Sequence, residues 1–276
     1  EFFSLISNTC GGYTFYKDAK LLRLTRYRYN NVPADINGKY LYIKDGDTVW
    51  NPGWQPVKTE LDSYECRHGL GYSRFTSKKD ELEASLLTFI PLEDTCEISH
   101  LTLTNHSNVS KDISLFSYVE WCLWDADDDM KNFQRNLNTG EVEVIDQVIY
   151  HKTEYRERRN HYAFHSVNTK TSGYDTDRDD FLGAYHGPES PEAVFSGSCH
   201  NSIASGWSPI AAHQIDVTLA PGESRTIIFL TGYAENPDAE KWEAPGVINK
   251  KPAHALLSRY SNPDQVQDAF LALRHY

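Results

Sequence analysis

The chain has 276 residues, which is enough to bury the core of one large domain or two ordinary ones. Its 27 Lys and Arg residues are outnumbered by 39 Asp and Glu residues, which gives a formal net charge of −12. Because this charge would repel a phosphate backbone, nucleic acid is excluded as an expected partner.

The cysteines and the amino terminus indicate where the protein works. Five widely spread cysteines, with no CxxC pair, argue against a disulfide framework and against a zinc site. No signal peptide and no apolar stretch of membrane-spanning length is visible. We therefore expect a cytoplasmic protein with no membrane partner and no metal. A start at Glu1 rather than Met suggests that the chain is part of a longer polypeptide.

Short runs of alternating or β-branched residues recur between turn signals along the chain. This pattern predicts an antiparallel, mainly β protein. The expected strands lie at residues 12–16, 39–43, 82–90, 96–105, 111–123, 140–152, 163–167, 211–219 and 224–233.

Two of the turns between these runs predict β-hairpins. The run at 96–105 alternates with a period of two, and a polar turn separates it from the next run at 113–119. Near the carboxyl end, Pro221 and Gly222 suit the central positions of a tight turn between two strands.

The spacing of apolar residues changes near residue 249. Apolar residues recur at helical spacing over 250–260 and again over 263–276. We interpret residues 1–248 as a β domain and 249–276 as a helical linker, with an apolar face that needs covering. The Gly-, Pro- and Asp-rich stretch 172–208 is expected to form long surface loops.

The most unusual segment, residues 121–141, combines two tryptophans with aspartates, amides and an arginine. Amide and guanidinium groups bind sugar hydroxyls and Trp offers a stacking face, so the segment is typical of a sugar subsite. A solvated acidic loop is an equally good interpretation. A calcium loop is a third, although the strict spacing of aspartates and glycine is absent.

Two arginine-rich clusters, at 18–31 and 151–162, could neutralise an anion such as phosphate, or form cross-strand ion pairs. Aromatic residues make up 13% of the chain, which suits both sugar stacking and an all-β core. No nucleophile elbow, P-loop, dinucleotide fingerprint or zinc-protease motif is present, so most familiar enzyme classes lack support.

Five blocks of the sequence, in order, resemble the amino-terminal third of the cellobiose phosphorylases, glycoside hydrolase family 94. They are ISNTCGGY (6–13), LTRYRYNN (24–31), YECRHGLGY (64–72), NFQRN (132–136) and YHKTEYRERRNHYAF (150–164). The resemblance implies a large antiparallel β-sandwich, the galactose-mutarotase-like supersandwich, followed by short linker helices toward an (α/α)6 catalytic barrel that this sequence lacks.

The resemblance also implies a reaction. Members of the family cleave cellobiose with inorganic phosphate to α-D-glucose 1-phosphate and D-glucose, with inversion. Phosphate, a co-substrate, attacks the anomeric carbon while one carboxylic acid protonates the leaving oxygen. That acid belongs to the barrel, so we expect no catalytic residue and no cofactor in this chain.

In this family the amino-terminal domain makes homodimer contacts and sends a loop over the partner's active site. The matching positions here are Asn132, Gln134, Arg135 and Asn136, with Gln134 and Arg135 as the first candidates for substrate contact. Asp125 stands where relatives can carry Asn, and its extra charge bears on acceptor preference.

Three alternatives stay open at this point. The protein could be a phosphorylase for another β-linked disaccharide, such as chitobiose or laminaribiose. The chain alone could be a carbohydrate-binding module, since it is rich in aromatic residues and has no catalytic motif. It could also be a purely structural dimerisation domain.

Overall fold

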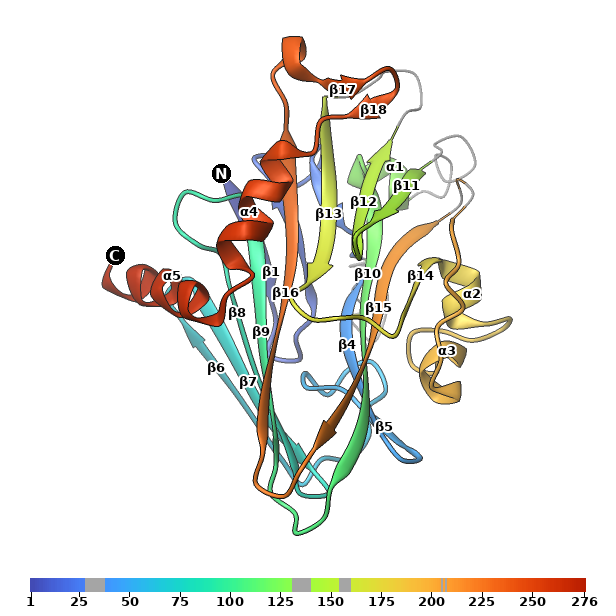
Figure 1. Ribbon diagram of the computed structural model, residues 1–276, viewed down its shortest axis with the longest axis vertical. Helices are drawn as coiled ribbons and strands as arrows, with labels where there is room; N and C mark the ends of the chain where they lie inside the picture. Colours follow the sequence, from blue (N-terminus) through green and yellow to red (C-terminus); the bar gives the residue numbers. More distant parts are fainter. Residues whose placement is uncertain (28–37, 131–139, 154–159, 205, 207) are drawn as a thin grey trace.

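Two antiparallel β-sheets of eight strands each pack face to face (Figure 1). This computed structural model describes residues 1–276 except 28–37, 131–139, 154–159, 205 and 207. The predicted mainly β, antiparallel sandwich is confirmed.

Sheet 1 has the strand order β1-β2-β3-β10-β15-β14, and β4 and β5 extend from the side of β10. The long strand β10 is its centre, because it pairs with β15 on one side and with β4 and then β3 on the other. Its strands are β1 (Phe2–Ile6), β2 (Gly12–Tyr16), β3 (Arg23–Thr25), β4 (Lys39–Asp45), β5 (Thr48–Trp50), β10 (Lys111–Trp124), β14 (Gly173–Asp177) and β15 (Pro209–Leu219).

Sheet 2 has the strand order β11-β12-β13-β16-β9-β8-β7-β6. Its strands are β6 (Ser63–Gly69), β7 (Tyr72–Lys79), β8 (Leu82–Phe89), β9 (Cys96–Asn105), β11 (Gly140–Ile145), β12 (Val148–Thr153), β13 (His161–Val167) and β16 (Ser224–Glu235). A separate two-stranded ribbon consists of β17 (Trp242–Ala244) and β18 (Val247–Ile248), just after the 3-10 turn η2 (Asp238–Glu240).

Alternate residues of both sheets point inward and form the core between them. Along β7, for example, Phe75 is fully buried while its neighbours on either side are half-buried. Phe75 packs with Leu101 and Phe229 of sheet 2 and with Ile43 and Leu115 of sheet 1. This period of two is the physical basis of the strand prediction.

Both predicted hairpins are wrong, because the turns are real but the strands beside them lie in different sheets. β9 pairs with β8 and β16, whereas β10 pairs with β3, β4 and β15. Likewise β15 belongs to sheet 1 and β16 to sheet 2. Each turn is therefore an arch that carries the chain from one sheet to the other.

The two arches are joined through the buried Asn105. Its side-chain amide donates to the carbonyl oxygens of Val109 at 2.7 Å and Leu219 at 3.0 Å. Its backbone N–H donates to the oxygen of Glu223 at 3.0 Å, and its own carbonyl accepts from the N–H of Gly222 at 2.9 Å. One side chain thus ties together two connections that are distant in sequence.

Two further segments differ from expectation. The predicted run at 140–152 is a hairpin of β11 and β12, turned at Asp146 and Gln147 with φ values of 49° and 66°. The stretch 172–208 is not all surface loop, since it contains β14 and the short helices α2 (Arg178–Leu182) and α3 (Glu192–Ser196). Both helices bury apolar side chains against sheet 1.

The two carboxyl-terminal helices, α4 (Lys251–Tyr260) and α5 (Pro263–His275), begin and end within one residue of the predicted positions. Their apolar faces are covered by the outer face of sheet 2, where Leu256 and Phe270 pack with Ile98 and Leu230 (Figure 1). Their role as a linker, and the boundary at residue 248, stay predictions.

Candidate functional site

The polar segment that follows β10 is the site predicted from the sequence. Of the five predicted substrate-binding residues, Asn132, Gln134, Arg135 and Asn136 lie outside the residues that the structure describes. Asp125 is described, as is the short helix α1 (Ala126–Met130) that starts the segment.

The side chain of Asp125 caps the start of this helix. Its Oδ1 accepts hydrogen bonds from the backbone N–H groups of Asp127 at 3.0 Å and Asp128 at 3.2 Å, as an N-cap residue does. The N–H of Ala126 donates to the oxygen of Lys20 at 2.7 Å, and the Lys20 ammonium lies 3.2 Å from Asp127. The turn before β3 therefore holds the helix from the other side.

The two tryptophans of the segment do not offer a face to a sugar, which corrects that part of the sequence interpretation. Trp121 and Trp124 are 0% and 1% exposed, because the end of β10 runs through the core. The Trp121 ring stacks on His151 at 5.4 Å, and the Trp124 ring meets His161 edge-on at 4.5 Å. Both rings stabilise the strand that carries the polar segment.

A buried ion network lies directly under α1. The guanidinium of Arg26 grips the carboxylate of Asp129 with two parallel hydrogen bonds of 2.7 Å, and Nη1 donates to Glu120. Glu120 also accepts from the Tyr118 hydroxyl at 3.0 Å and lies 3.2 Å from Nε of Arg178. Arg26, Glu120 and Asp129 are all at most 6% exposed.

This network is electrically balanced. Two guanidinium groups face two carboxylates, so each buried charge has a partner. Burial alone would lower the pKa of Arg26, but the carboxylates of Glu120 and Asp129 raise it above its usual range. For Tyr118, burial and the charge of Glu120 act together, and both raise the pKa of its hydroxyl. The network therefore fixes α1 in place, and Arg26 and Tyr118 keep their protons near neutral pH.

Arg26 was present in the sequence only as one member of an arginine-rich cluster. Its two carboxylate partners lie 94 and 103 residues further along the chain. The arginines of 18–31 and the acidic character of residues 125–129 were visible in the sequence, but no local pattern pairs Arg26 with Glu120 and Asp129. The arginines of the second cluster, Arg156, Arg158 and Arg159, lie outside the described residues.

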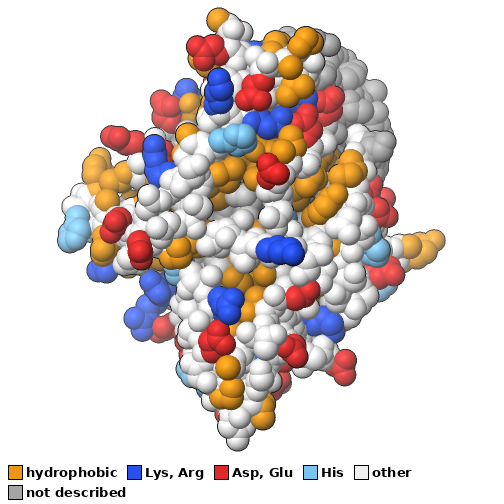
Figure 2. Space-filling view, in the orientation of Figure 1, with side chains coloured by type: hydrophobic (Ala, Val, Ile, Leu, Met, Phe, Trp, Pro, Cys, Tyr) orange, Lys and Arg blue, Asp and Glu red, His pale blue; other side chains and the backbone are white. Residues whose placement is uncertain are grey.

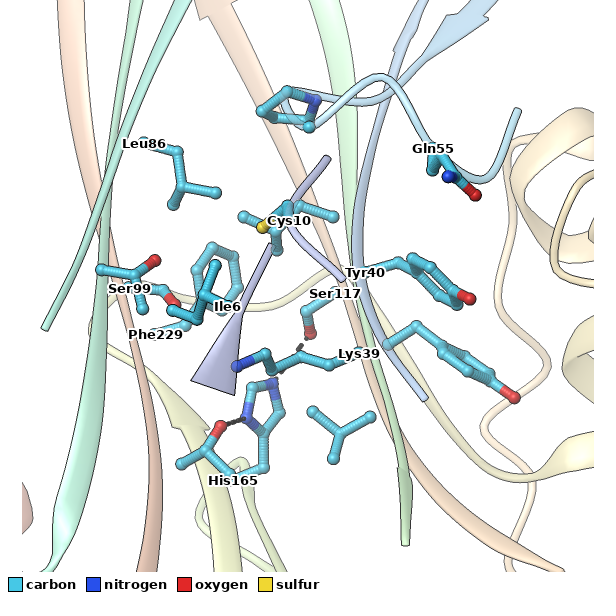
Figure 3. A pocket seen from close by; sticks show the side chains of 17 residues that line it. Ile6, Cys10, Lys39, Tyr40, Gln55, Leu86, Ser99, Ser117, His165 and Phe229 are labelled. Atoms are coloured by element: carbon cyan, nitrogen blue, oxygen red, sulfur yellow. Dashed lines mark hydrogen bonds between the residues drawn. The ribbon is translucent and has the colours of Figure 1, made fainter. Parts of the chain in front are cut away.

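A small cavity lies between the two sheets (Figure 3). Its volume of about 40 Å³ is room for about three water molecules, too little for a sugar ring. The Lys39 ammonium on its wall is paired with the buried Glu97. Next to it, His165 contacts the hydroxyls of Ser117 at 3.1 Å and Thr231 at 2.9 Å, and burial holds its pKa well below the usual value.

Metal-binding side chains and surface charge were compared across the described residues. No group of three His, Cys, Asp or Glu side chains within them could hold a metal ion, and all five cysteines are free thiols. On the face seen in Figure 2, basic and acidic side chains are interspersed rather than gathered into a basic patch.

Residues 1–263 match the family described as "Glycosyl hydrolase 94, supersandwich domain". The chain belongs to this family. The family level of the sequence resemblance is thereby confirmed, and the supersandwich is the architecture in which the two sheets and their arches are built.

Several relatives are phosphorylases. The chain is 29% identical over 286 residues to the N,N'-diacetylchitobiose phosphorylase of Vibrio furnissii, covering all of this chain and 33% of the relative. It is 32% identical over 237 residues to the solabiose phosphorylase of Paenibacillus borealis, covering 83% of this chain and 31% of the relative. The chain thus spans about a third of the length of these relatives, and cellobiose is not the substrate in either name.

Among solved structures, a bacterial glucoamylase complexed with acarbose shares the fold. Its TM-score is 0.58 at 9% identity, covering 99% of this supersandwich chain and 34% of the glucoamylase. None of the described helices combines the length and the apolar character that crossing a bilayer requires.

Proposed function

We propose that this supersandwich domain is part of an inverting disaccharide phosphorylase that converts cellobiose and phosphate to α-D-glucose 1-phosphate and D-glucose. The observation that carries the proposal is the family match over residues 1–263, together with the phosphorylase names of the relatives. The five sequence blocks favour cellobiose as the first candidate substrate.

In this proposal the chain does not break the bond itself. A carboxylic acid in polypeptide outside residues 1–276 protonates the leaving oxygen, while phosphate attacks the anomeric carbon and needs no base. The domain serves homodimer formation in the cytoplasm and closes the partner's active site, with no cofactor.

We assign acceptor-sugar contact to Gln134 and Arg135, with Asn132 and Asn136 beside them. The support is indirect. The helix α1 that precedes them is anchored by a buried, charge-balanced network rather than by exposed contacts alone. A segment that positions a partner's substrate needs such a fixed base, because small displacements of a binding group are costly.

The first experiment joins residues 1–276 to their catalytic domain and measures sugar release from cellobiose with and without phosphate. We expect glucose 1-phosphate only when phosphate is present, and phosphate-independent hydrolysis would contradict the proposal. A panel that adds chitobiose and laminaribiose tests the substrate. The V. furnissii relative makes chitobiose the main competitor.

A second experiment tests the role of the polar segment. We expect Arg135→Ala to lower kcat/KM by about 10²-fold, equivalent to about 2.7 kcal/mol. The matched control is Arg67→Ala, which removes an exposed arginine whose ion pair with Glu65 lies at the surface. If Arg135→Ala turns over at the rate of the control, the domain is a structural dimerisation unit.

A stand-alone carbohydrate-binding role has one observation in its favour. Phe3 and Phe15 stack at 5.2 Å on the outer face of β1 and β2, and Phe3 is 48% exposed. Tyr13 continues the row at 5.9 Å from Phe15. Calorimetry of the isolated chain with cello-oligosaccharides at two temperatures tests this role. We expect a binding heat that Phe3→Ala diminishes, and no heat at either temperature would count against the role.

A further inference from the structure

The first strand, β1, is an edge of sheet 1 and pairs only with β2. The bonds at both ends of this pairing fix which backbone groups face β2. The N–H of Lys17 donates to the oxygen of Glu1 at 2.7 Å, and the N–H of Ser7 donates to the oxygen of Gly11 at 2.7 Å. Bonded pairs alternate along an antiparallel ladder, so the odd-numbered residues of β1 carry the bonds to β2.

The even-numbered residues therefore point their backbone groups the other way. Phe3 and Leu5 are bonded to β2, and their side chains lie on the outer face, 48% and 50% exposed. The N–H and C=O groups of Phe2, Ser4 and Ile6 face the free edge, and no hydrogen bond from them to any described residue is found. An edge with such a row of open donors and acceptors is a template for another strand.

A groove runs along this same edge. It has a volume of about 390 Å³ and is lined by Phe2, Ser4 and Ile6 on one side, by Tyr72 and Phe89 of sheet 2 on another, and by Leu273 of α5. One strand residue fills about 160 Å³, from a rise of ~3.3 Å, a strand spacing of ~4.8 Å and a sheet spacing of ~10 Å. The groove therefore holds two or three residues of an extended chain.

The carboxylate in the groove, that of Glu97, is already paired. The buried carboxylate of Glu97 pairs with the Lys39 ammonium and accepts from the Thr14 hydroxyl at 2.8 Å. Burial alone would raise the pKa of Glu97, but Lys39 lowers it below its usual value, so the carboxylate stays charged and paired. What the groove offers a ligand is the line of backbone groups of β1, with apolar side chains and the polar side chains of His68, Ser73 and Thr88 on its walls.

We propose that this groove accepts an extended peptide segment, which adds to β1 as a ninth strand of sheet 1 and points apolar side chains at alternate positions toward sheet 2. This mode of recognition uses main-chain hydrogen bonds for affinity and alternate side chains for specificity. A second folded copy does not suit a space of this size, since stable dimers bury about 1,200–2,000 Å². A sugar is the less suitable occupant, because the open groups belong to the backbone and repeat along β1 at the spacing that a paired strand matches.

The test uses residues 1–276 and the probe peptide acetyl-Lys-Val-Thr-Val-Thr-Val-Lys-amide, followed by amide hydrogen exchange. Without the peptide, Phe3 and Leu5 should be protected while Phe2, Ser4 and Ile6 exchange freely. With it, we expect exchange at Phe2, Ser4 and Ile6 to slow at least tenfold. N-methylation of the central Val should abolish the effect and N-methylation of a Thr should not, since residues opposite each other face the same side.

A tethered form removes the dependence on affinity. The sequence Lys-Val-Thr-Val-Thr-Val is placed ahead of Glu1 through an Asn-Gly turn, which favours a hairpin with β1. If Phe2, Ser4 and Ile6 still exchange freely in the tethered chain, the proposal is overturned.

Two substitutions of Ser4 distinguish the contribution of its backbone N–H to peptide binding from that of its side chain. Ser4→Pro removes only an N–H that makes no bond to β2, so we expect the chain to keep its melting temperature within a few degrees and to bind the peptide about tenfold more weakly. Ser4→Ala, the matched control, should bind normally. Equal binding by both variants would overturn the proposal. So would dimerisation of the free chain that Ser4→Pro abolishes, or displacement of the peptide by cello-oligosaccharides.

Discussion

Acid should destabilise this domain well before its carboxylates are protonated, because several histidines are buried in neutral form. Burial lowers the pKa of His151 to about 3 and that of His213 to about 4. His151 lies beside the rings of Trp121 and Trp124, at 5.4 Å and 6.0 Å, so protonation would place a positive charge against two buried aromatic rings.

The sign and size follow from proton linkage. A histidine whose folded pKa is depressed contributes stability that is present above its unfolded pKa of ~6.5 and is lost as the pH falls toward the folded value. Between pH 7 and pH 5, His151 and His213 should each cost about 2 kcal/mol, or about 4 kcal/mol together. The lowered pKa of Glu97 keeps its own contribution out of this window.

Urea unfolding at pH 7, 6 and 5 measures this loss of folding free energy. The variant His151→Phe removes the part of the loss that His151 contributes. Phenylalanine keeps a flat ring among the tryptophans but cannot take up a proton. We expect the variant to lose about 2 kcal/mol less than the parent chain between pH 7 and pH 5. An unchanged loss in His151→Phe would refute the assignment of acid sensitivity to this buried ring.

Three further predictions concern the backbone and the ion network. Arg26→Met should lower the free energy of unfolding by about 3–5 kcal/mol, measured in urea, because it leaves the Asp129 carboxylate buried without a counter-charge and Glu120 with Arg178 alone. Equal stability would refute the buried network. Gly12→Ala should prevent folding, since a Cβ at this position would lie 1.7 Å from a backbone oxygen of β1. The control Gly46→Ala, whose Cβ would have nothing within 4 Å, should lower the free energy of unfolding by only about 1 kcal/mol. Asp125→Ala should cost about 0.5–2 kcal/mol through loss of the helix cap, and a change below that range would mean that the cap is dispensable.

The strands could be predicted from the sequence because the alternation of buried and exposed residues depends only on neighbouring positions in the chain. The run at Cys96–Asn105, for example, has the bounds that its alternation indicates. What could not be predicted is which sheet the chain enters after a turn. A Pro-Gly turn reverses the chain equally well in a hairpin and in an arch, and the choice depends on partners such as β15 for β10, about a hundred residues away.

The candidate site shows the same limit. Trp121 and Trp124 were correctly seen as unusual, but their burial depends on β12 and β13 packing over them. Arg26 could not be distinguished from the other arginines of its cluster, because its bidentate partner Asp129 comes from a different part of the chain. The family-level resemblance reached further than the local patterns because it compares the chain as a whole.

The position of β16 has a consequence for how the domain is made in the cell. This strand lies between β9 and β13, yet it is the last strand of sheet 2 to be synthesised. Until it leaves the ribosome, β9 and β13 each lack a neighbour and expose an open edge, so sheet 2 cannot close during translation of the earlier strands. Nascent chains halted before Ser224 should therefore be the form most in need of a chaperone.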